Sequence, residues 1–258
     1  MNILVLGDVV SSSGCEFVRK KLPSLKKLKG IDYCIANGEN SAKGNGVTPA
    51  SAEFLFSSGI DFITGGNHSF RRSEIYDFLD EREDIIRPYN YPGEAYGKGV
   101  SVIDLGRAKI AVINLMGTML MGENLDNPFY AADRALKETD GAKIVLVDFH
   151  AEATSEKKAL GYYLDGRVSA FFGTHTHVQT ADECILKGGT GYISDLGMCG
   201  PEESVLGVDK DIIIKKFRTN LPCRFDTADD RDCMLNGCIF SVDEKTGRCT
   251  DIERINLR

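Results

Sequence analysis

The sequence predicts an α/β fold. Over the first two thirds of the chain, short apolar runs closed by glycine or a polar residue alternate with segments whose apolar residues recur at helical spacing. The last third is richer in short strand-like runs that glycine, proline and acidic turns separate. No repeat, low-complexity stretch or linker interrupts this pattern. We therefore predict one domain over residues 1–258, long enough to bury a large core.

The expected elements follow in chain order. Strands are predicted over residues 3–7, 31–36, 60–64, 100–105, 109–115, 143–149, 168–172, 183–186, 190–194, 211–217, 236–242 and 249–255. Helices are predicted over residues 16–28, 49–59, 73–79, 128–139 and 152–160. Thr48 followed by Pro49 is typical of an N-cap with proline at the first helical position. Gly106 and Arg107 are expected to join two strands of a hairpin, and residues 197–201 are expected in a loop.

Composition limits the classes of partner. Apolar content of 42% and charged content of 27% are ordinary for a soluble globular protein. The net charge of −7 argues against long nucleic acid, whose binders present a basic face, but is compatible with a small anion held by metals. No segment reaches the ~18 apolar residues of a membrane span. The N-terminus is typical of a first strand, not of a signal peptide, so we expect a cytoplasmic protein; the sequence leaves a homo-oligomer open.

The eight cysteines are expected to be mainly small buried residues. None forms a Cys-x-x-Cys pair, and a reducing compartment would keep them as thiols. Cys223, Cys233, Cys238 and Cys249 lie close in sequence, but their spacing does not match a zinc finger. A structural zinc site is therefore disfavoured.

The four histidines all follow strand-like runs. His150 comes directly after one and His68 shortly after another, and His175 and His177 follow a run that is closed by Gly173. On a continuing strand the last two would point to opposite faces, but a turn after Gly173 can aim both at one point. Because neutral imidazole is a common metal ligand, four histidines at strand ends predict a metal site.

Other strand ends carry oxygen ligands. In open α/β sheets ligands gather beyond the carboxyl ends of the strands, so these segments are expected to converge. The predicted metal ligands are Asp8, Glu39, Asn40, Asn67, His150, His175 and His177. They are too many for one metal with an open position and suit two metals that share a carboxylate. Two cations roughly 3.5–4 Å apart can hold a hydroxide between them and bind two phosphoryl oxygens. Oxygen and nitrogen ligands without thiolate favour iron, manganese, zinc or nickel.

Other sites built from similar parts fit less well. A metallo-β-lactamase requires an HxHxDH run, but valine follows His177 here. An amidohydrolase barrel places its HxH pair on an early strand, and a haloacid-dehalogenase phosphatase requires a second aspartate where Val10 stands. No dinucleotide-binding or P-loop motif occurs. Asp8 alone could be a helix cap and His150 alone a strand-end residue, so only the combination indicates a metal site.

The order of these motifs resembles that of the calcineurin-like metallophosphoesterase superfamily. The matching motifs are Gly7-Asp8, Glu39-Asn40, Gly66-Asn67-His68, His150 and Gly173-Thr174-His175-Thr176-His177. The chain is most similar to the YmdB-like 2′,3′-cyclic nucleotide phosphodiesterase family. The wider superfamily normally has Asp-x-His at the first strand and a bridging aspartate, whereas this chain has Asp8-Val9-Val10 and Glu39, as that branch does. Runs at residues 148–157, 164–170, 173–182 and 197–201 extend the resemblance over essentially the whole chain, more loosely in the last third.

The resemblance implies a four-layer α/β/β/α sandwich that carries a two-metal phosphodiesterase. Asp8, Glu39, Asn40 and His177 would hold one metal, and Glu39 would bridge to a second held by Asn67, His150 and His175. Iron or manganese is expected, with zinc or nickel as alternatives. A metal-bridging hydroxide would attack phosphorus in line, and His68 would protonate the leaving oxygen, a role that typically contributes about 10²–10⁴-fold in rate. The implied substrates are 2′,3′-cyclic nucleotides and artificial phosphodiesters.

Two alternatives stay open. A phosphomonoesterase or nucleotidase would use the same metals on a monoester. A metal-dependent regulatory protein would bind a nucleotide with little turnover, but such a protein has little use for a proton donor at His68.

Overall fold

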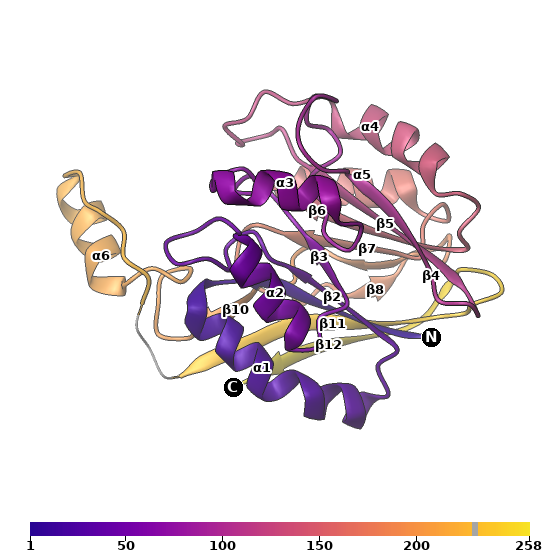
Figure 1. The fold of residues 1–258 in the computed structure, drawn as a ribbon, viewed down its shortest axis with the longest axis horizontal. Helices are drawn as coiled ribbons and strands as arrows, with labels where there is room; N and C mark the ends of the chain where they lie inside the picture. Colours follow the sequence, from indigo (N-terminus) through magenta and orange to yellow (C-terminus); the bar gives the residue numbers. More distant parts are fainter. Residues whose placement is uncertain (229–231) are drawn as a thin grey trace.

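The computed structural model describes residues 1–228 and 232–258 and contains two β-sheets that lie face to face (Figure 1). The first has the order β12-β11-β10-β1-β2-β3 and the second the order β4-β5-β6-β7-β9-β8. The strands are β1 (Asn2–Val9), β2 (Tyr33–Asn37), β3 (Phe62–Thr64), β4 (Val100–Asp104), β5 (Lys109–Met116), β6 (Ile144–His150), β7 (Ala170–Thr174), β8 (Cys184–Ile185), β9 (Gly191–Ile193), β10 (Met198–Pro201), β11 (Cys233–Val242) and β12 (Cys249–Leu257).

Helices cover the outer face of each sheet. The helices of the described residues are α1 (Ser11–Lys29), α2 (Pro49–Ser57), α3 (Tyr76–Glu81), α4 (Pro128–Ala135), α5 (Thr154–Leu164) and α6 (Lys210–Thr219), with 3-10 turns η1 (Ser73–Ile75) and η2 (Leu136–Glu138); all but α6 lie near a sheet (Figure 1). Helices α1 and α2 pack on the first sheet and α4 and α5 on the second. Within the described ranges, no helix combines the length and the apolar character needed to cross a lipid bilayer.

Alternation along the strands separates the core into three apolar layers. Leu4 of β1 faces the helices while its neighbour Ile3 faces the second sheet. On β6, Leu146 faces the first sheet while Val147 faces helices α4 and α5. Successive side chains of a strand point to opposite faces, so each sheet is buried on both sides. Three apolar interfaces between four layers confirm the predicted α/β/β/α sandwich.

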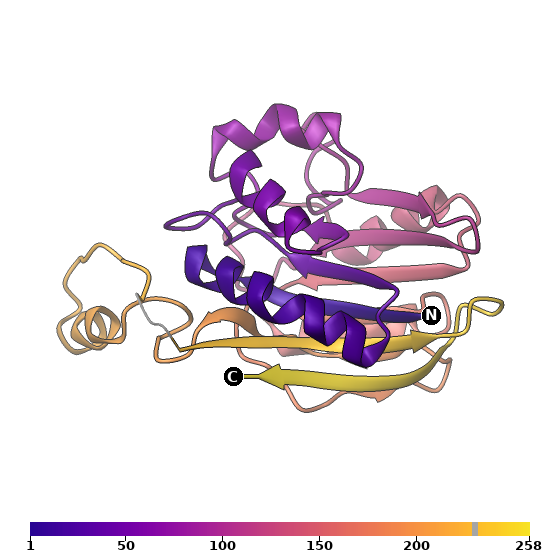
Figure 2. The same cartoon turned by 60° about the horizontal axis from the view of Figure 1, so that its bottom comes forward.

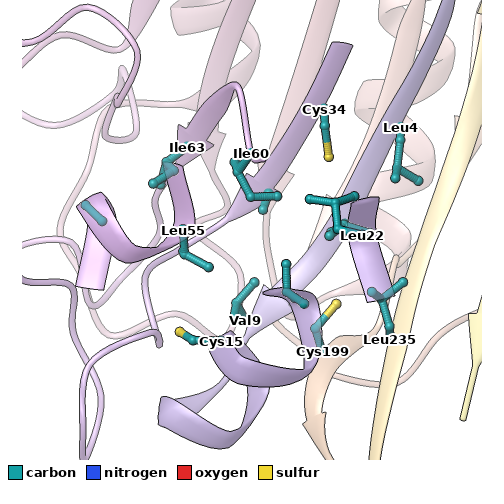
Figure 3. Close-up of a cluster of buried hydrophobic side chains, with 14 of the residues drawn as sticks. Leu4, Val9, Cys15, Leu22, Cys34, Leu55, Ile60, Ile63, Cys199 and Leu235 are labelled. Atoms are coloured by element: carbon teal, nitrogen blue, oxygen red, sulfur yellow. The ribbon is translucent and has the colours of Figure 1, made fainter. Parts of the chain in front are cut away.

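Figure 3 shows the outermost of these layers, where α1 and α2 meet the first sheet. Leu22 of α1 and Leu55 of α2 are fully buried in one cluster with Leu4 and Cys34. Cysteines fill gaps in this layer, and six of the eight in the chain are buried. Their place in the core agrees with the sequence-based expectation that most are small buried residues.

Parallel pairing brings strand ends to one edge. Strands β1, β2 and β3 run parallel, as do β5, β6, β7 and β9. Between Leu6 and Asp8 the register of β1 against β2 shifts at Gly7, and a Cβ at Gly7 would lie 2.0 Å from the carbonyl oxygen of Gly197. Bulges of this kind re-aim the side chains that follow. Glycine at position 7 therefore allows the close approach that sets the direction of Asp8.

The predicted strand over residues 211–217 is wrong, because this segment is helix α6. The Asp209 side chain accepts hydrogen bonds from the N–H groups of Asp211 (2.9 Å) and Ile212 (3.1 Å), and Asn220 ends the helix with φ 54°. The isoleucine run 212–214 favoured a strand, but the cap and the left-handed end favour a helix. In both views α6 lies apart from the two sheets (Figures 1 and 2).

Most other predicted elements differ from the observed ones by a few residues at their ends, and two larger differences lie beside β1. Helix α1 begins at Ser11, five residues before the predicted start at residue 16, directly after the bulged end of β1. The predicted loop 197–201 contains β10, which pairs with β1 and β11. Its buried backbone is thus hydrogen-bonded in the first sheet, which a four-residue run with glycine and proline does not reveal.

Leu22→Ala is expected to lower the free energy of unfolding by about 2–5 kcal/mol, because it removes a fully buried side chain and leaves a cavity. Leu28 lies on the same helix but is 80% exposed. Leu28→Ala is the matched control and should change stability by less than about 0.5 kcal/mol. Urea denaturation of both variants measures the difference, and equal losses would contradict the packing of α1 described above.

Candidate metal centre

The carboxyl ends of five strands bring the eight predicted side chains to one edge of the sandwich. Asp8 lies near the end of β1; Glu39 and Asn40 follow β2; Asn67 and His68 follow β3; His150 ends β6; His175 and His177 follow β7. Asp8, Glu39 and His150 are buried, and one ligand atom of each lies within 4.8 Å of the others. The structure thus places side chains from both sheets around one point.

Glu39 lies at the middle of this group. Its Oε1 accepts a hydrogen bond from Asn40 Nδ2 (2.9 Å) and lies 3.5 Å from His150 Nε2. Its Oε2 accepts one from the backbone N–H of His68 (2.8 Å). Burial alone would raise the pKa of Glu39, but His150 and His68 outweigh it and hold the pKa below its ordinary value. Glu39 is therefore a buried carboxylate that contacts neighbours on both sides.

Asp8 and His177 form one side of the group. Asp8 Oδ2 accepts a hydrogen bond from the N–H of His175 (3.1 Å), and Asp8 Oδ1 lies 3.5 Å from His177 Nε2. His177 Nδ1 donates to the carbonyl of Leu206 (3.0 Å), which leaves Nε2 facing Asp8 and Asn40. Burial opposes charge on the imidazole, but Asp8 raises the pKa of His177 to about 9.

His150, Asn67 and His175 form the other side. His150 Nε2 lies 2.8 Å from Asn67 Oδ1 and 3.1 Å from His175 Nδ1. Burial lowers the pKa of His150 to about 4, so its imidazole is neutral at pH 7. A neutral imidazole has one nitrogen with a free lone pair, as a metal ligand requires.

A strained turn aims His175 and His177 at the same point. Both have positive φ (98° and 62°), a conformation that costs free energy in any residue except glycine. A buried ion pair holds the turn: Lys157 Nζ donates to the carbonyl of Thr174 (3.0 Å) and to Asp195 Oδ2 (2.6 Å). The strain is thus localised where two predicted ligands must converge.

The donor set fits a cation. Among the described residues, Asp8 Oδ1 is buried with no hydrogen-bond partner. Carboxylate, amide oxygen and imidazole together suit divalent first-row metals. Gly66 lies against the group, and a Cβ there would be 2.3 Å from Glu39 Oε2 and 2.5 Å from the ring of His150. The space that these side chains enclose is therefore kept open by glycine.

Sequence reasoning gave no role to a second group beneath the predicted ligands. Asp148 is fully buried and contacts Thr64 and Thr174, and Glu152 Oε2 lies 3.3 Å from His175 Nε2. One signal was available: Asp148 lies inside an apolar run, two residues before His150, and therefore on the same face of β6. A buried aspartate that shares a face with a predicted ligand indicates a partner for that ligand.

Gly66→Ala is expected to weaken metal binding by at least about tenfold, because its Cβ displaces Glu39 or His150. Gly93→Ala is the matched control, since a Cβ there meets no atom within 4 Å. Isothermal titration of both metal-free proteins with Mn²⁺ measures the effect. Unchanged affinity in Gly66→Ala would show that the enclosed space does not hold the metal.

Comparison with known proteins identifies the family of this chain. The family model described as YmdB-like protein matches residues 4–255. A Bacillus subtilis 2′,3′-cyclic-nucleotide 2′-phosphodiesterase is 46% identical over 99% of this chain and 96% of its own length. The crystal structure of a Thermus thermophilus protein has 38% identity and a TM-score of 0.93, and the match covers 100% of this chain and 99% of that protein. The crystal structure of a Mycoplasma pneumoniae protein described as a novel phosphatase has 34% identity and a TM-score of 0.94, and the match covers 100% of this chain and 93% of that protein. This chain belongs to the YmdB-like protein family.

Proposed function

We propose that the protein is a dinuclear metal-dependent phosphodiesterase that opens 2′,3′-cyclic nucleotides. The observation that carries the proposal is the convergence of two carboxylates, two amides and three histidines, with His68 beside them. Family membership and the 46% identical relative, named as a cyclic-nucleotide phosphodiesterase, support a phosphoric ester hydrolase. The single domain, cytoplasmic location and homo-oligomeric state considered from the sequence stay predictions.

The two sides of the group would each hold one ion. Asp8, Asn40 and His177 form one ligand set and Asn67, His150 and His175 the other, with Glu39 between them. Iron or manganese suits these oxygen and nitrogen ligands, with zinc or nickel as alternatives. When bound, two such ions lower the pKa of water and offset negative charge on phosphoryl oxygens.

His68 is the proposed proton donor. Its Nδ1 lies 3.1 Å from Glu39 Oε1 and 3.0 Å from Asn40 Oδ1, which fixes the ring and directs Nε2 away from both residues. The side chain is 30% exposed, whereas that of Glu39 is 1% exposed. Burial opposes charge on the ring, but Glu39 raises the pKa of His68 above its ordinary value. The Glu39 carboxylate thus favours the protonated imidazole, and the exposed part of the ring can reach a substrate.

The reaction consumes one water. The water oxygen forms a new bond to phosphorus while the bond between phosphorus and the ribose 2′ oxygen breaks, and the 2′ oxygen takes the proton from His68 Nε2. A proton released by the water returns His68 to its protonated form, and a nucleoside 3′-monophosphate leaves. The choice of the 2′ bond follows the name of the Bacillus subtilis relative. Protonation of the leaving oxygen matters because an alkoxide is a poor leaving group at neutral pH.

Purified protein supplied with manganese is expected to convert 2′,3′-cyclic AMP to 3′-AMP, and removal of metal with a chelator is expected to abolish turnover. Chromatography of the products checks both statements. Re-addition of manganese to the chelated protein should restore activity. Turnover that persists in the metal-free protein would contradict the proposal.

His68→Ala is expected to lower kcat by about 10²–10⁴-fold with metal content unchanged, because it removes a proton donor and no ligand. Glu39→Gln is the contrasting variant and should lose bound metal and activity together. Elemental analysis alongside kinetics separates the two effects. Loss of metal in His68→Ala would make His68 a ligand instead, and a fully metallated Glu39→Gln would remove the bridging assignment.

A phosphomonoesterase with the same metals is the second candidate, because the Mycoplasma pneumoniae relative is described as a phosphatase. The ratio of kcat/KM for 2′,3′-cyclic AMP to that for 3′-AMP separates the candidates. A ratio above one supports the diesterase, and a ratio below one supports the monoesterase.

A further inference from the structure

Asp148 is a buried carboxylate outside the proposed ligand set. It lies on β6 with no exposed surface, directly beneath His150 on the same face of the strand. Its Oδ1 accepts a hydrogen bond from Thr174 Oγ1 (2.7 Å), and its Oδ2 accepts one from Thr64 Oγ1 (2.5 Å). Burial of a carboxylate is costly, and the hydrogen bonds from the two threonine hydroxyls offset part of that cost.

The Thr174 hydroxyl connects Asp148 to His150. Thr174 Oγ1 lies 2.7 Å from Asp148 Oδ1 and 3.0 Å from His150 Nδ1. A hydroxyl has one proton, and an ionised carboxylate can only accept. When Thr174 gives its proton to Asp148, its oxygen can only accept from His150, so Nδ1 must carry the imidazole proton.

Asn37 does not compete for the same nitrogen. Its Nδ2 lies 3.5 Å from His150 Nδ1, longer than its contacts with the carbonyl of Gly65 (3.0 Å) and with Asp148 Oδ2 (3.4 Å). Those two acceptors use both amide protons. The Asn37 Oδ1 accepts from the N–H of Glu39 (3.1 Å), which fixes the orientation of the amide.

We infer that Asp148 and Thr174 are positioning residues that keep the proton of neutral His150 on Nδ1 and present the Nε2 lone pair to the metal centre. Nε2 faces Asn67 Oδ1 and Glu39 Oε1, which are also lone-pair donors. With its proton on Nδ1, the Nε2 lone pair of His150 joins those of Asn67 and Glu39, and a cation can bind all three. The predicted effect on metal affinity rests on the proposed metal centre. The predicted tautomer does not, since it is a property of the metal-free protein.

The tautomer can be read directly by long-range ¹⁵N–¹H correlation spectra of histidine-labelled, metal-free protein. The chain has four histidines, so single-histidine variants assign the signals. At about pH 8.5, where carboxylates are ionised and imidazoles are neutral, His150 is expected as the Nδ1–H form because the Thr174 hydroxyl donates to Asp148. Thr174→Val removes the acceptor and should shift His150 to the Nε2–H form, in which Asn67 accepts the proton. Asp148→Ala should do the same, because the Thr174 hydroxyl is then free to donate to Nδ1.

Zn²⁺ affinity, measured by competition with a chromophoric chelator, gives the second readout. Thr174→Val is expected to bind Zn²⁺ about 10–100-fold more weakly, the usual effect of losing a partner of a metal-bound histidine. Thr64→Val is the matched control: it removes the other hydroxyl from Asp148 but does not contact His150. Its affinity should change by less than about threefold, and Thr174→Ser, which keeps the hydroxyl, should bind as the wild type does.

The tautomer and Zn²⁺ affinity measurements test this inference independently of the hydrolysis assays. An Nε2–H tautomer in the wild type, an unchanged Nδ1–H tautomer in Thr174→Val, or equal loss of affinity in Thr64→Val would each overturn the inference. Circular dichroism melts identify a variant that fails to fold; if Thr174→Val does so, the His150 tautomer of the wild type and its shift to Nε2–H in Asp148→Ala still decide. Failure to hydrolyse cyclic nucleotide would leave the tautomer result intact.

Discussion

The site depends on the apolar contact between the inner faces of the two sheets. That contact fixes how far the end of β1, β2 and β3 lies from the end of β6 and β7, and the candidate ligands come from both sets. Hydrogen bonds continue the contact where the apolar residues stop. The N–H of Gly65, from the first sheet, donates to Asn114 Oδ1 of β5 (3.0 Å), and Thr64 Oγ1 donates to Asp148. Buried polar groups that pair across a layer specify one alignment, because any other leaves them unsatisfied.

The need to hold one alignment near the site also explains why an ion pair, Lys157 with Asp195, is buried at this edge of the sheets. Lys157 and Asp195 are each 2% exposed, and Asp195 also accepts from the backbone N–H groups of Thr176 (3.2 Å) and Gly197 (2.8 Å). A buried ion pair is weak evidence for stability, but loss of one partner is costly. This pair ties α5 to the turn that carries His175 and to the start of β10. The ion pair therefore fixes the conformation of this turn, whose strained backbone is maintained only by surrounding contacts.

The sequence was most informative for residues that combine a metal-binding side chain with a place at the end of a predicted strand. The candidate site residues could be predicted because each lies at or just after the end of a strand, and parallel strands bring such residues together. Asp148 and Lys157 received no role, because their partners are distant in sequence and the sequence does not show which segments lie side by side. Helix α6 was missed for a different reason: β-branched residues 212–214 favour a strand locally, while the side chain of Asp209 stabilises the helix start. Topology and capping, rather than composition, decide these cases.

The side chains around the metal centre differ in solvent exposure, and this difference indicates from which direction a substrate can approach. Asp8, Glu39 and His150 are at most 1% exposed, whereas the side chains of His68 and His175 are 30% and 23% exposed. A ligand that only holds a metal gains from burial, since low dielectric strengthens its interaction with a cation. A proton donor must also touch the leaving group, so it has to reach the surface. The exposed edge formed by His68 and His175 is therefore where the proposed phosphodiester substrate would bind, while Asp148 and Thr174 lie behind the buried ligand His150.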